Sequence, residues 1–251
     1  MLYVVTNWHV IENGNTTIRM KTRDGRNSIL ATDERAWTFH ANGDDLAVIA
    51  VFFDPRDHSF FYISQSMFLT NEIVSEFNIG PGDDTFVVGR FINHEGRQKN
   101  LPTVRFGCIA QMANEPVRQA SGFEQESFLV EARSIGGYSG SPVFTYIPPA
   151  TVRDGVQDWV PEKILSFHGP WLLGVEWGQI NDYTPVLHST GRDVNPGEPL
   201  STKVLVNTGM MAVVPAWKLL ELLSDRRLDG NARRMVEYLN SLAAKPLATS
   251  N

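Results

Sequence analysis

The sequence predicts an all-β fold made of two consecutive units, followed by helices near the C-terminus. Most of the chain consists of short runs rich in β-branched and aromatic residues, separated by Gly, Asn, Asp and Pro. Runs of this length at this spacing are typical of a β-barrel or a β-sandwich. From Pro215 onward the apolar residues recur instead at helical spacing.

Six apolar runs make up the first unit. Asn13-Gly14 and Asp24-Gly25 are residue pairs that favour tight turns, and Asp54-Pro55 ends the longest run. Residues 64–79 are less regular and predict a connector or a short helix between the units. The expected strands are Leu2–Thr6, Thr16–Met20, Ser28–Ala31, Ala36–His40, Leu46–Phe53 and Phe60–Ile63.

A second set of strands is expected after the turn Gly80-Pro81-Gly82. Residues 148–163 and 178–201 are rich in Pro, Gly and Asp, which indicates long surface loops between these strands. The expected strands are Thr85–Phe91, Thr103–Ala110, Ser127–Ala132, Ser141–Tyr146, Trp171–Trp177 and Val204–Val214.

Two helices are expected at the C-terminus. Pro215 suits the first turn of a helix, because it lacks an N–H that the helix would leave unpaired there. Gly230 separates two apolar stripes, which we expect to pack on the β units. The stripes consist of Leu219, Leu220, Leu222 and Leu223, and of Met235, Leu239 and Leu242.

Composition excludes several classes of protein. The chain is 42% hydrophobic and 20% charged, as in ordinary soluble proteins, and has no apolar run near the ~20 residues that span a bilayer. A net charge of −6 without an extended basic patch argues against a nucleic-acid partner. Cys108 is the single cysteine, so an intramolecular disulfide and a thiolate zinc site are excluded. The N-terminus resembles no signal peptide, and a cytoplasmic location is expected for the chain as given.

Three residues at predicted strand ends supply the groups needed for nucleophilic catalysis. His9 follows the first run, Asp45 precedes a long apolar run, and Ser139 lies among Gly136, Gly137 and Gly140. A serine hydroxyl is a weak nucleophile until an imidazole takes its proton, and a carboxylate orients that imidazole. The glycines permit a tight turn whose amides face a developing oxyanion, and we expect the amides of Gly137 and Ser139 to do so.

Each of these residues alone has an ordinary structural explanation. His9 could be a structural histidine, Ser139 a turn residue, and Asp45 a cap, with Asp44 competing for the role of the acid. The combination of the three is much rarer than its members. The remaining histidines show no metal-ligand spacing, and no metal or other cofactor is expected.

Three motifs resemble those of the chymotrypsin-like (trypsin-like) serine peptidases, in particular the bacterial members. They are Val5-Thr6-Asn7-Trp8-His9, Asp45-Leu46-Ala47-Val48 and Gly137-Tyr138-Ser139-Gly140-Ser141-Pro142, in the family's order of His, Asp and Ser. Leu173-Gly174-Val175-Glu176-Trp177-Gly178 is similar to the strand that lines the family's substrate cleft. The resemblance runs from about residue 1 to residue 223. It implies two six-stranded antiparallel β-barrels with the triad at their interface, and peptide-bond hydrolysis through an acyl-enzyme.

The resemblance also implies a division of the chain and a set of substrate-binding residues. Residues 1–78 would form the barrel that contains His9 and Asp45, residues 79–214 the barrel that contains Ser139, and residues 215–251 the C-terminal helices and tail. Arg133 falls at the base of the primary specificity pocket, where it would disfavour basic side chains, although a loop arginine facing solvent is the alternative. The other substrate-binding residues implied are Gly136, Trp177 and Gly178.

The sequence departs from the family pattern at two places. The family has further strands before the histidine motif, but only eight residues precede His9, which leaves an incomplete first barrel as one expectation. Tyr138 replaces the aspartate that pairs with a newly cut N-terminus in trypsin-type zymogens, so activation by that ion pair is not expected.

Two functions from different classes remain open at this point. The first is a serine endopeptidase that acts on a protein or peptide. The alternative is a peptide-binding or regulatory module on the same fold, inactive until a partner or a further segment completes it. An esterase of the strand-to-helix type is disfavoured because the order of its triad residues differs.

Overall fold

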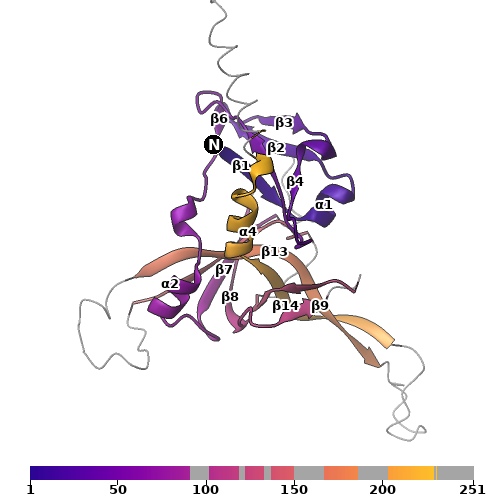
Figure 1. Cartoon of the computed structure of the whole chain (residues 1–251), viewed down its shortest axis with the longest axis vertical. Coiled ribbons are helices and arrows are strands. Elements are labelled where there is room, and N and C mark those ends of the chain that lie inside the picture. Colours follow the sequence, from indigo (N-terminus) through magenta and orange to yellow (C-terminus); the bar gives the residue numbers. More distant parts are fainter. Residues whose placement is uncertain are drawn as a thin grey trace, which may run out of the picture.

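The chain folds into a mostly β structure with few helices, as the sequence predicts (Figure 1). The computed structural model describes residues 1–90, 102–118, 122–132, 137–149, 167–185, 203–228 and 230. The N-terminal strands form one unit, the later strands form a second, and helix α4 (Ala216–Leu223) lies where the two meet (Figure 1).

The second unit is a closed, six-stranded antiparallel barrel with the order β11-β14-β13-β12-β7-β8. Its interior is filled by apolar side chains from alternate positions of the strands, among them Val87, Ile109, Val143 and Met211. A separate two-stranded hairpin, β9 (Pro116–Arg118) and β10 (Glu124–Glu126), accompanies it. The barrel strands are β7 (Asp84–Gly89), β8 (Thr103–Gln111), β11 (Phe128–Glu131), β12 (Pro142–Ile147), β13 (His168–Pro185) and β14 (Lys203–Pro215).

The first unit consists of two three-stranded sheets, β1-β5-β4 and β3-β2-β6. Pairing among the described strands does not close them into the second barrel that the sequence led us to expect. One physical reason is strand length, because β4 and β6 each contain two residues and offer few hydrogen bonds to a neighbour. The strands are β1 (Leu2–Thr6), β2 (Thr17–Thr22), β3 (Asn27–Ala31), β4 (Thr38–Phe39), β5 (Ala47–Val51) and β6 (His58–Ser59).

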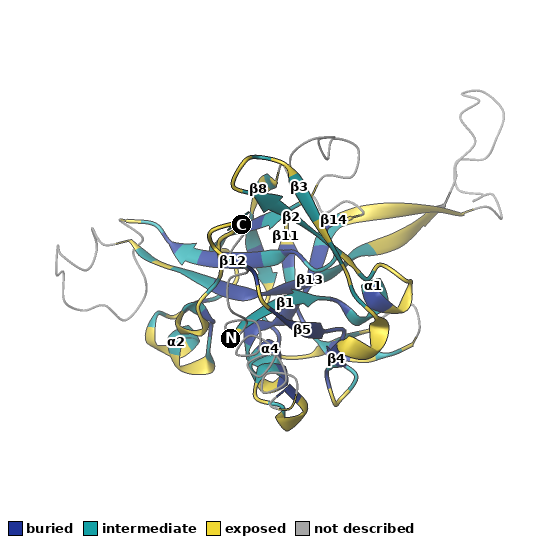
Figure 2. Ribbon diagram, turned by 90° about the horizontal axis from the view of Figure 1, so that it is seen from above, coloured by how far each residue is buried: buried dark blue, intermediate teal, exposed yellow. Residues whose placement is uncertain are grey.

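Strand β5 joins the two units because it is buried on both faces (Figure 2). Successive side chains of a strand point to opposite faces. Ala47, Ile49 and Val51 therefore pack in the core of the first unit, while Val48 packs with side chains of β12, β13 and α4. The catalytic candidate Asp45 lies just before this strand, and its backbone is bonded to both units, because its carbonyl accepts from Asn7 and its amide donates to Gln125.

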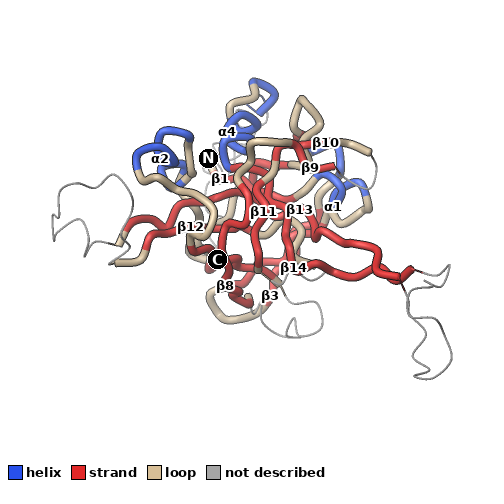
Figure 3. Tube along the Cα trace, turned by 90° about the horizontal axis from the view of Figure 1, so that it is seen from below, coloured by secondary structure: helices blue, strands red, loops and turns tan. Residues whose placement is uncertain are grey.

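The helices lie around the strands rather than among them (Figure 3). In α4, Ala216, Leu219 and Leu222 are buried against β5 and the barrel, which confirms the first predicted helix. The other helices whose bounds the structure describes are α1 (Trp8–Glu12), α2 (Asn71–Glu76) and the 3₁₀ turns η1 (Glu34–Ala36) and η2 (Gln65–Met67). The helix expected after Gly230 falls outside the described residues. None of the described helices has the length and apolar character to cross a membrane.

Two expectations about strands are corrected by the structure. The strand expected at residues 60–63 lies earlier, at His58–Ser59, and Phe61 is fully exposed. The loop expected at residues 178–201 is wrong for residues 178–185, because β13 continues to Pro185 and pairs with β14 in an exposed ribbon (Figure 2). The rest of that expected loop, residues 186–201, lies outside the described residues. The polar residues of β13 after Gly178 pair with β14 through backbone hydrogen bonds, and such pairing does not require an alternating apolar pattern in the sequence. The short strands β9 and β10 were not predicted.

Candidate active site

His9 lies in the first turn of α1, which follows directly after β1 at the junction of the two units. Asn7 precedes the helix in extended conformation and is fully buried, and its side-chain amide donates to the carbonyl oxygen of Asp45 at 2.8 Å. This bond connects the two chain segments that bear the histidine and the acid.

The Asp45 carboxylate contacts His9 through both oxygens. Oδ1 accepts from the backbone amide of His9 at 2.9 Å, and Oδ2 lies 2.6 Å from the ring nitrogen Nδ1. A carboxylate only accepts, so we assign the ring proton to Nδ1, which leaves Nε2 able to accept a proton. The His9 side chain is 39% exposed while that of Asp45 is 9% exposed. In this arrangement Nε2 has the orientation and tautomer that a general base needs.

The surroundings of His9 stabilise its protonated form. The hydrogen bond to Asp45 is the largest cause and raises the pKa of His9 above its ordinary value, partial burial opposes this, and the charges of Asp45, Glu176 and Glu12 raise the pKa further. Glu176 lies on β13 and is buried. Two further carboxylates, those of Glu176 and Glu12, therefore act on the histidine besides Asp45.

Ser139 sits in a tight turn that the glycines make possible. Gly137 and Gly140 have φ angles of 98° and 85°, which side-chain-bearing residues rarely adopt. The Ser141 amide donates to the Tyr138 carbonyl at 2.8 Å, and the Gly140 amide donates to the Glu176 carbonyl at 2.9 Å. The turn is thus fixed to itself and to β13.

The turn is packed against the strand that leads to His9. A Cβ atom added at Gly140 would lie 2.6 Å from Thr6 Oγ1, so only glycine allows this approach. The structure therefore brings half-buried Ser139 to the end of β1 and to the region of His9. Among the described residues no hydrogen bond joins the Ser139 hydroxyl to His9, and hydrogen bonds of this kind are often long without substrate.

The chain also matches a family of known proteins. Residues 2–146, more than half of the chain, match the family described as trypsin-like peptidase domain. The chain belongs to this family. No curated protein gives a significant match. The matched region of this peptidase domain includes His9, Asp45 and Ser139, and ends before β13 and β14.

The predicted oxyanion and substrate residues of the peptidase domain are placed only in part. Gly137 is exposed, and in the described part of the chain neither its amide nor that of Ser139 donates a hydrogen bond. Trp177 packs at the junction of the units and donates from Nε1 to Ser127 Oγ at 3.0 Å, and Gly178 faces open space. Arg133 and Gly136 lie outside the described residues. The described side chains include no group of three or more metal-ligating residues.

Three consecutive residues that sequence reasoning missed connect parts of the peptidase domain. Buried Gln125 accepts from the Asp45 amide through Oε1 at 2.9 Å, Glu126 accepts from Trp217 Nε1 at 2.9 Å, and Ser127 accepts from Trp177. Residues 125–127 therefore link Asp45, helix α4 and the strand of the expected cleft. No local signal could have revealed Gln125, because it is 80 residues from its partner.

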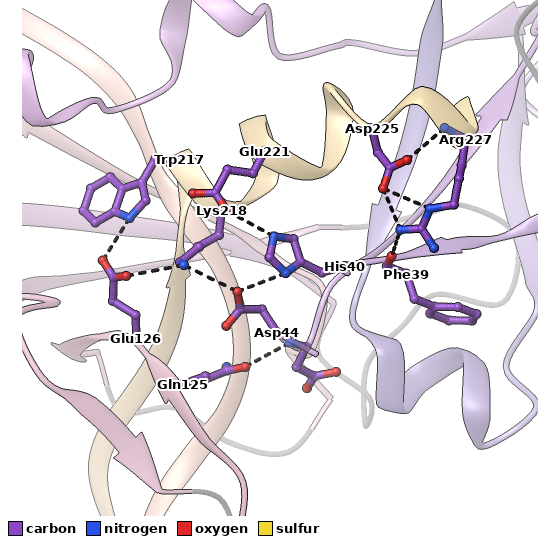
Figure 4. Close-up of polar contacts among 11 residues, drawn as sticks. Phe39, His40, Asp44, Gln125, Glu126, Trp217, Lys218, Glu221, Asp225 and Arg227 are labelled. Atoms are coloured by element: carbon purple, nitrogen blue, oxygen red, sulfur yellow. Dashed lines mark hydrogen bonds and ion pairs between the residues drawn. The ribbon is translucent and has the colours of Figure 1, made fainter. Parts of the chain in front are cut away.

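A charged network next to Asp45 ties the peptidase domain to its C-terminal helix (Figure 4). Asp44 Oδ2 lies 3.0 Å from His40 Nδ1 and 3.7 Å from Lys218 Nζ. Burial acts to raise the pKa of Asp44, but His40 and Lys218 outweigh it and hold that pKa below its ordinary value. Lys218 Nζ also lies 3.6 Å from Glu126 Oε2. Asp44 thus faces α4, whereas Asp45 faces His9.

Glu176→Gln is expected to move the acidic limb of the activity profile to lower pH. The base form of His9 is lost as pH falls through its pKa, which is raised above the ordinary 6.5, and removing a nearby negative charge lowers that pKa. The rate constant for labelling by a fluorophosphonate, measured against pH, reports this limb. Glu131→Gln on β11 is the matched control, because its exposed side chain is not among the charges that act on His9. An unmoved limb in Glu176→Gln contradicts the electrostatic role.

Proposed function

We propose that this peptidase domain is a serine endopeptidase that hydrolyses peptide bonds of a protein or peptide substrate through an acyl-enzyme. Ser139 Oγ attacks the scissile carbonyl, and His9 Nε2 takes its proton and then gives it to the leaving amine. Asp45 keeps the ring in the required tautomer, and the amides of Gly137 and Ser139 stabilise the oxyanion. Water then attacks the acyl-enzyme, and His9 again acts as base.

The observation that best supports the proposal is the double contact between Asp45 and His9. A structural histidine needs only one partner, but here the ring and the amide of the same residue are fixed by one carboxylate. The glycine turn that presents Ser139 packs against Thr6, three residues before His9, whose side chain is 39% exposed. The mechanism uses side chains and amides of this chain alone, and we propose neither a cofactor nor a nucleic-acid partner.

The test is labelling of the full chain by a fluorophosphonate, which reacts only with an activated serine. We expect one adduct per molecule, mapped to Ser139 by mass spectrometry and absent from Ser139→Ala and His9→Ala. Ser75→Ala, which removes an exposed hydroxyl on α2, serves as the control and should label like the wild type. A folded wild type that forms no adduct would contradict the proposal.

The alternative is a peptide-binding or regulatory module that a partner activates. The open pairing of the first unit and the lack of a described hydrogen bond between Ser139 and His9 favour it. Such a module would bind peptides without labelling, so the same experiment separates the two functions.

A further inference from the structure

The side chain of Tyr138 lies inside the barrel although the next residue is the candidate nucleophile. Tyr138 is fully buried and belongs to the barrel core, together with residues such as Val87, Val143 and Leu173. Ser139 is half-buried at the surface of the same turn. The backbone between them is therefore held from one side by a large ring that cannot move without opening a cavity in the core.

A polar anchor fixes the far end of this ring. The Tyr138 hydroxyl accepts from Arg105 Nε at 2.9 Å and lies 2.6 Å from Thr103 Oγ1. Thr103 Oγ1 in turn donates to the Gly89 carbonyl at 3.3 Å, so the hydroxyl of Tyr138 is the donor to Thr103. The Arg105 guanidinium also lies 5.3 Å from the centre of the ring, within the range of a cation–π contact.

The space for the ring depends on a glycine in a neighbouring strand. A Cβ atom added at Gly89 on β7 would lie 2.6 Å from Tyr138 Cε1 and 2.7 Å from Ser141 Oγ. These distances are too short for real atoms, so any side chain there would displace the ring or the turn. Two neighbouring strands, β7 and β8, thus define one position for Tyr138.

We infer that Tyr138 is a positioning residue that holds the nucleophile turn in its working geometry, through its buried ring and its anchor on Arg105 and Thr103. This inference rests on the proposed serine peptidase function. In trypsin-type zymogens an ion pair between an aspartate and the newly cut N-terminus fixes this turn, but this chain has Tyr138 in place of that aspartate. The hydrogen bonds of Tyr138 to Arg105 and Thr103 replace that ion pair. The turn is then preformed and needs no cleavage of the chain to become active.

Tyr138→Phe tests the anchor because it keeps the ring and removes only the hydroxyl. We expect kcat and the fluorophosphonate labelling rate to fall about 100-fold with KM nearly unchanged, since a small displacement of a reacting group costs about that much. Tyr146→Phe is the matched control, because it removes a hydroxyl from β12 of the same barrel and should keep the wild-type kcat. A Tyr138→Phe variant with wild-type kcat would overturn the inference.

Gly89→Ala tests the ring itself, and Gly80→Ala is its matched control. An alanine at residue 89 must displace Tyr138, whereas a Cβ at residue 80 meets no neighbour. We expect Gly89→Ala to lower kcat at least as much as Tyr138→Phe, and Gly80→Ala to keep it. Equal activities of the two alanine variants would contradict the inference.

Hydrogen exchange gives a readout that does not depend on activity. In Tyr138→Phe the amides of Gly140 and Ser141 should exchange about tenfold faster, while those of β5 should not change. A wild type that labels, together with unchanged exchange and unchanged kcat in the variant, overturns the role of Tyr138 and leaves the serine peptidase function intact. A wild type that does not label overturns the proposed function, and hydrogen exchange alone then decides whether Tyr138 holds the turn.

A variant with an N-terminal extension tests whether the turn is preformed. The extension should leave fluorophosphonate labelling unchanged, and labelling that requires its removal contradicts a preformed turn.

Discussion

Ser139→Ala and His9→Ala are each expected to lower kcat by about 10⁶-fold, and the double variant should lose no more than either. The reason is that the two residues act in a single proton transfer, so removing either partner ends it. Independent contributions would multiply, and the double variant would then lose about 10¹²-fold. The measurement is kcat with a fluorogenic peptide that the wild type cleaves.

The control for this double-variant comparison is a histidine outside the site. The ring centres of His58 and Phe53 lie 5.9 Å apart with the rings tilted by 47°, and His58 is half-buried on β6. His58→Ala therefore removes a comparable ring without touching the reacting groups. We expect its kcat to stay close to that of the wild type. Losses in Ser139→Ala and His9→Ala that add in free energy would contradict a shared proton transfer.

The sequence predicted the local features of this fold better than its long-range pairing. Strand β1 has the predicted bounds because its apolar run ends at the polar residue Thr6, and helix α1 starts directly after Asn7. Strand β10 escaped prediction because two of its three residues are charged, and its buried residue is the polar Gln125. Its burial depends on the Asp45 amide of the other unit, which no sequence window contains.

The extent of β13 shows the same limit. Its first part is apolar and was expected, but its continuation to Pro185 is polar and exists through backbone pairing with β14, as between Asp182 and Val206. Breaker-rich composition predicts loops correctly only where no partner strand is present. Closure of a barrel likewise depends on pairing between distant strands, so the open sheets of the first unit could not be predicted from its runs.

The candidate site stays a prediction, and it could be made from the sequence because its chemistry depends on residue types in short motifs. His9, Asp45 and Ser139 each lie beside a strand end or a glycine turn, and those signals are local. The adjacent acids Asp44 and Asp45 could be separated only by resemblance. In the structure the Asp44 side chain points to His40 and Lys218 (Figure 4). The Asp45 side chain contacts His9 instead.

Asp45→Asn is expected to lower kcat by about 10⁴-fold while the chain stays folded. The asparagine oxygen can still accept from the His9 amide, but its NH₂ group then faces Nδ1, where Asp45 Oδ2 lies at 2.6 Å. An NH₂ group donates, so Nδ1 must accept and the proton moves to Nε2, which can then no longer take the proton of Ser139. The measurement is kcat with the same peptide, together with the free energy of unfolding in urea.

Asp44→Asn separates this effect from a general loss of the turn. It removes the charge that lies near His40 and Lys218 and keeps the contact between Asp45 and His9. We therefore expect the free energy of unfolding to fall by about 1–3 kcal/mol and kcat to fall by less than about tenfold. If Asp44→Asn lowered kcat as much as Asp45→Asn, the orienting acid would be misassigned. The two variants differ by one position in the chain, so only the direction of each side chain explains different outcomes.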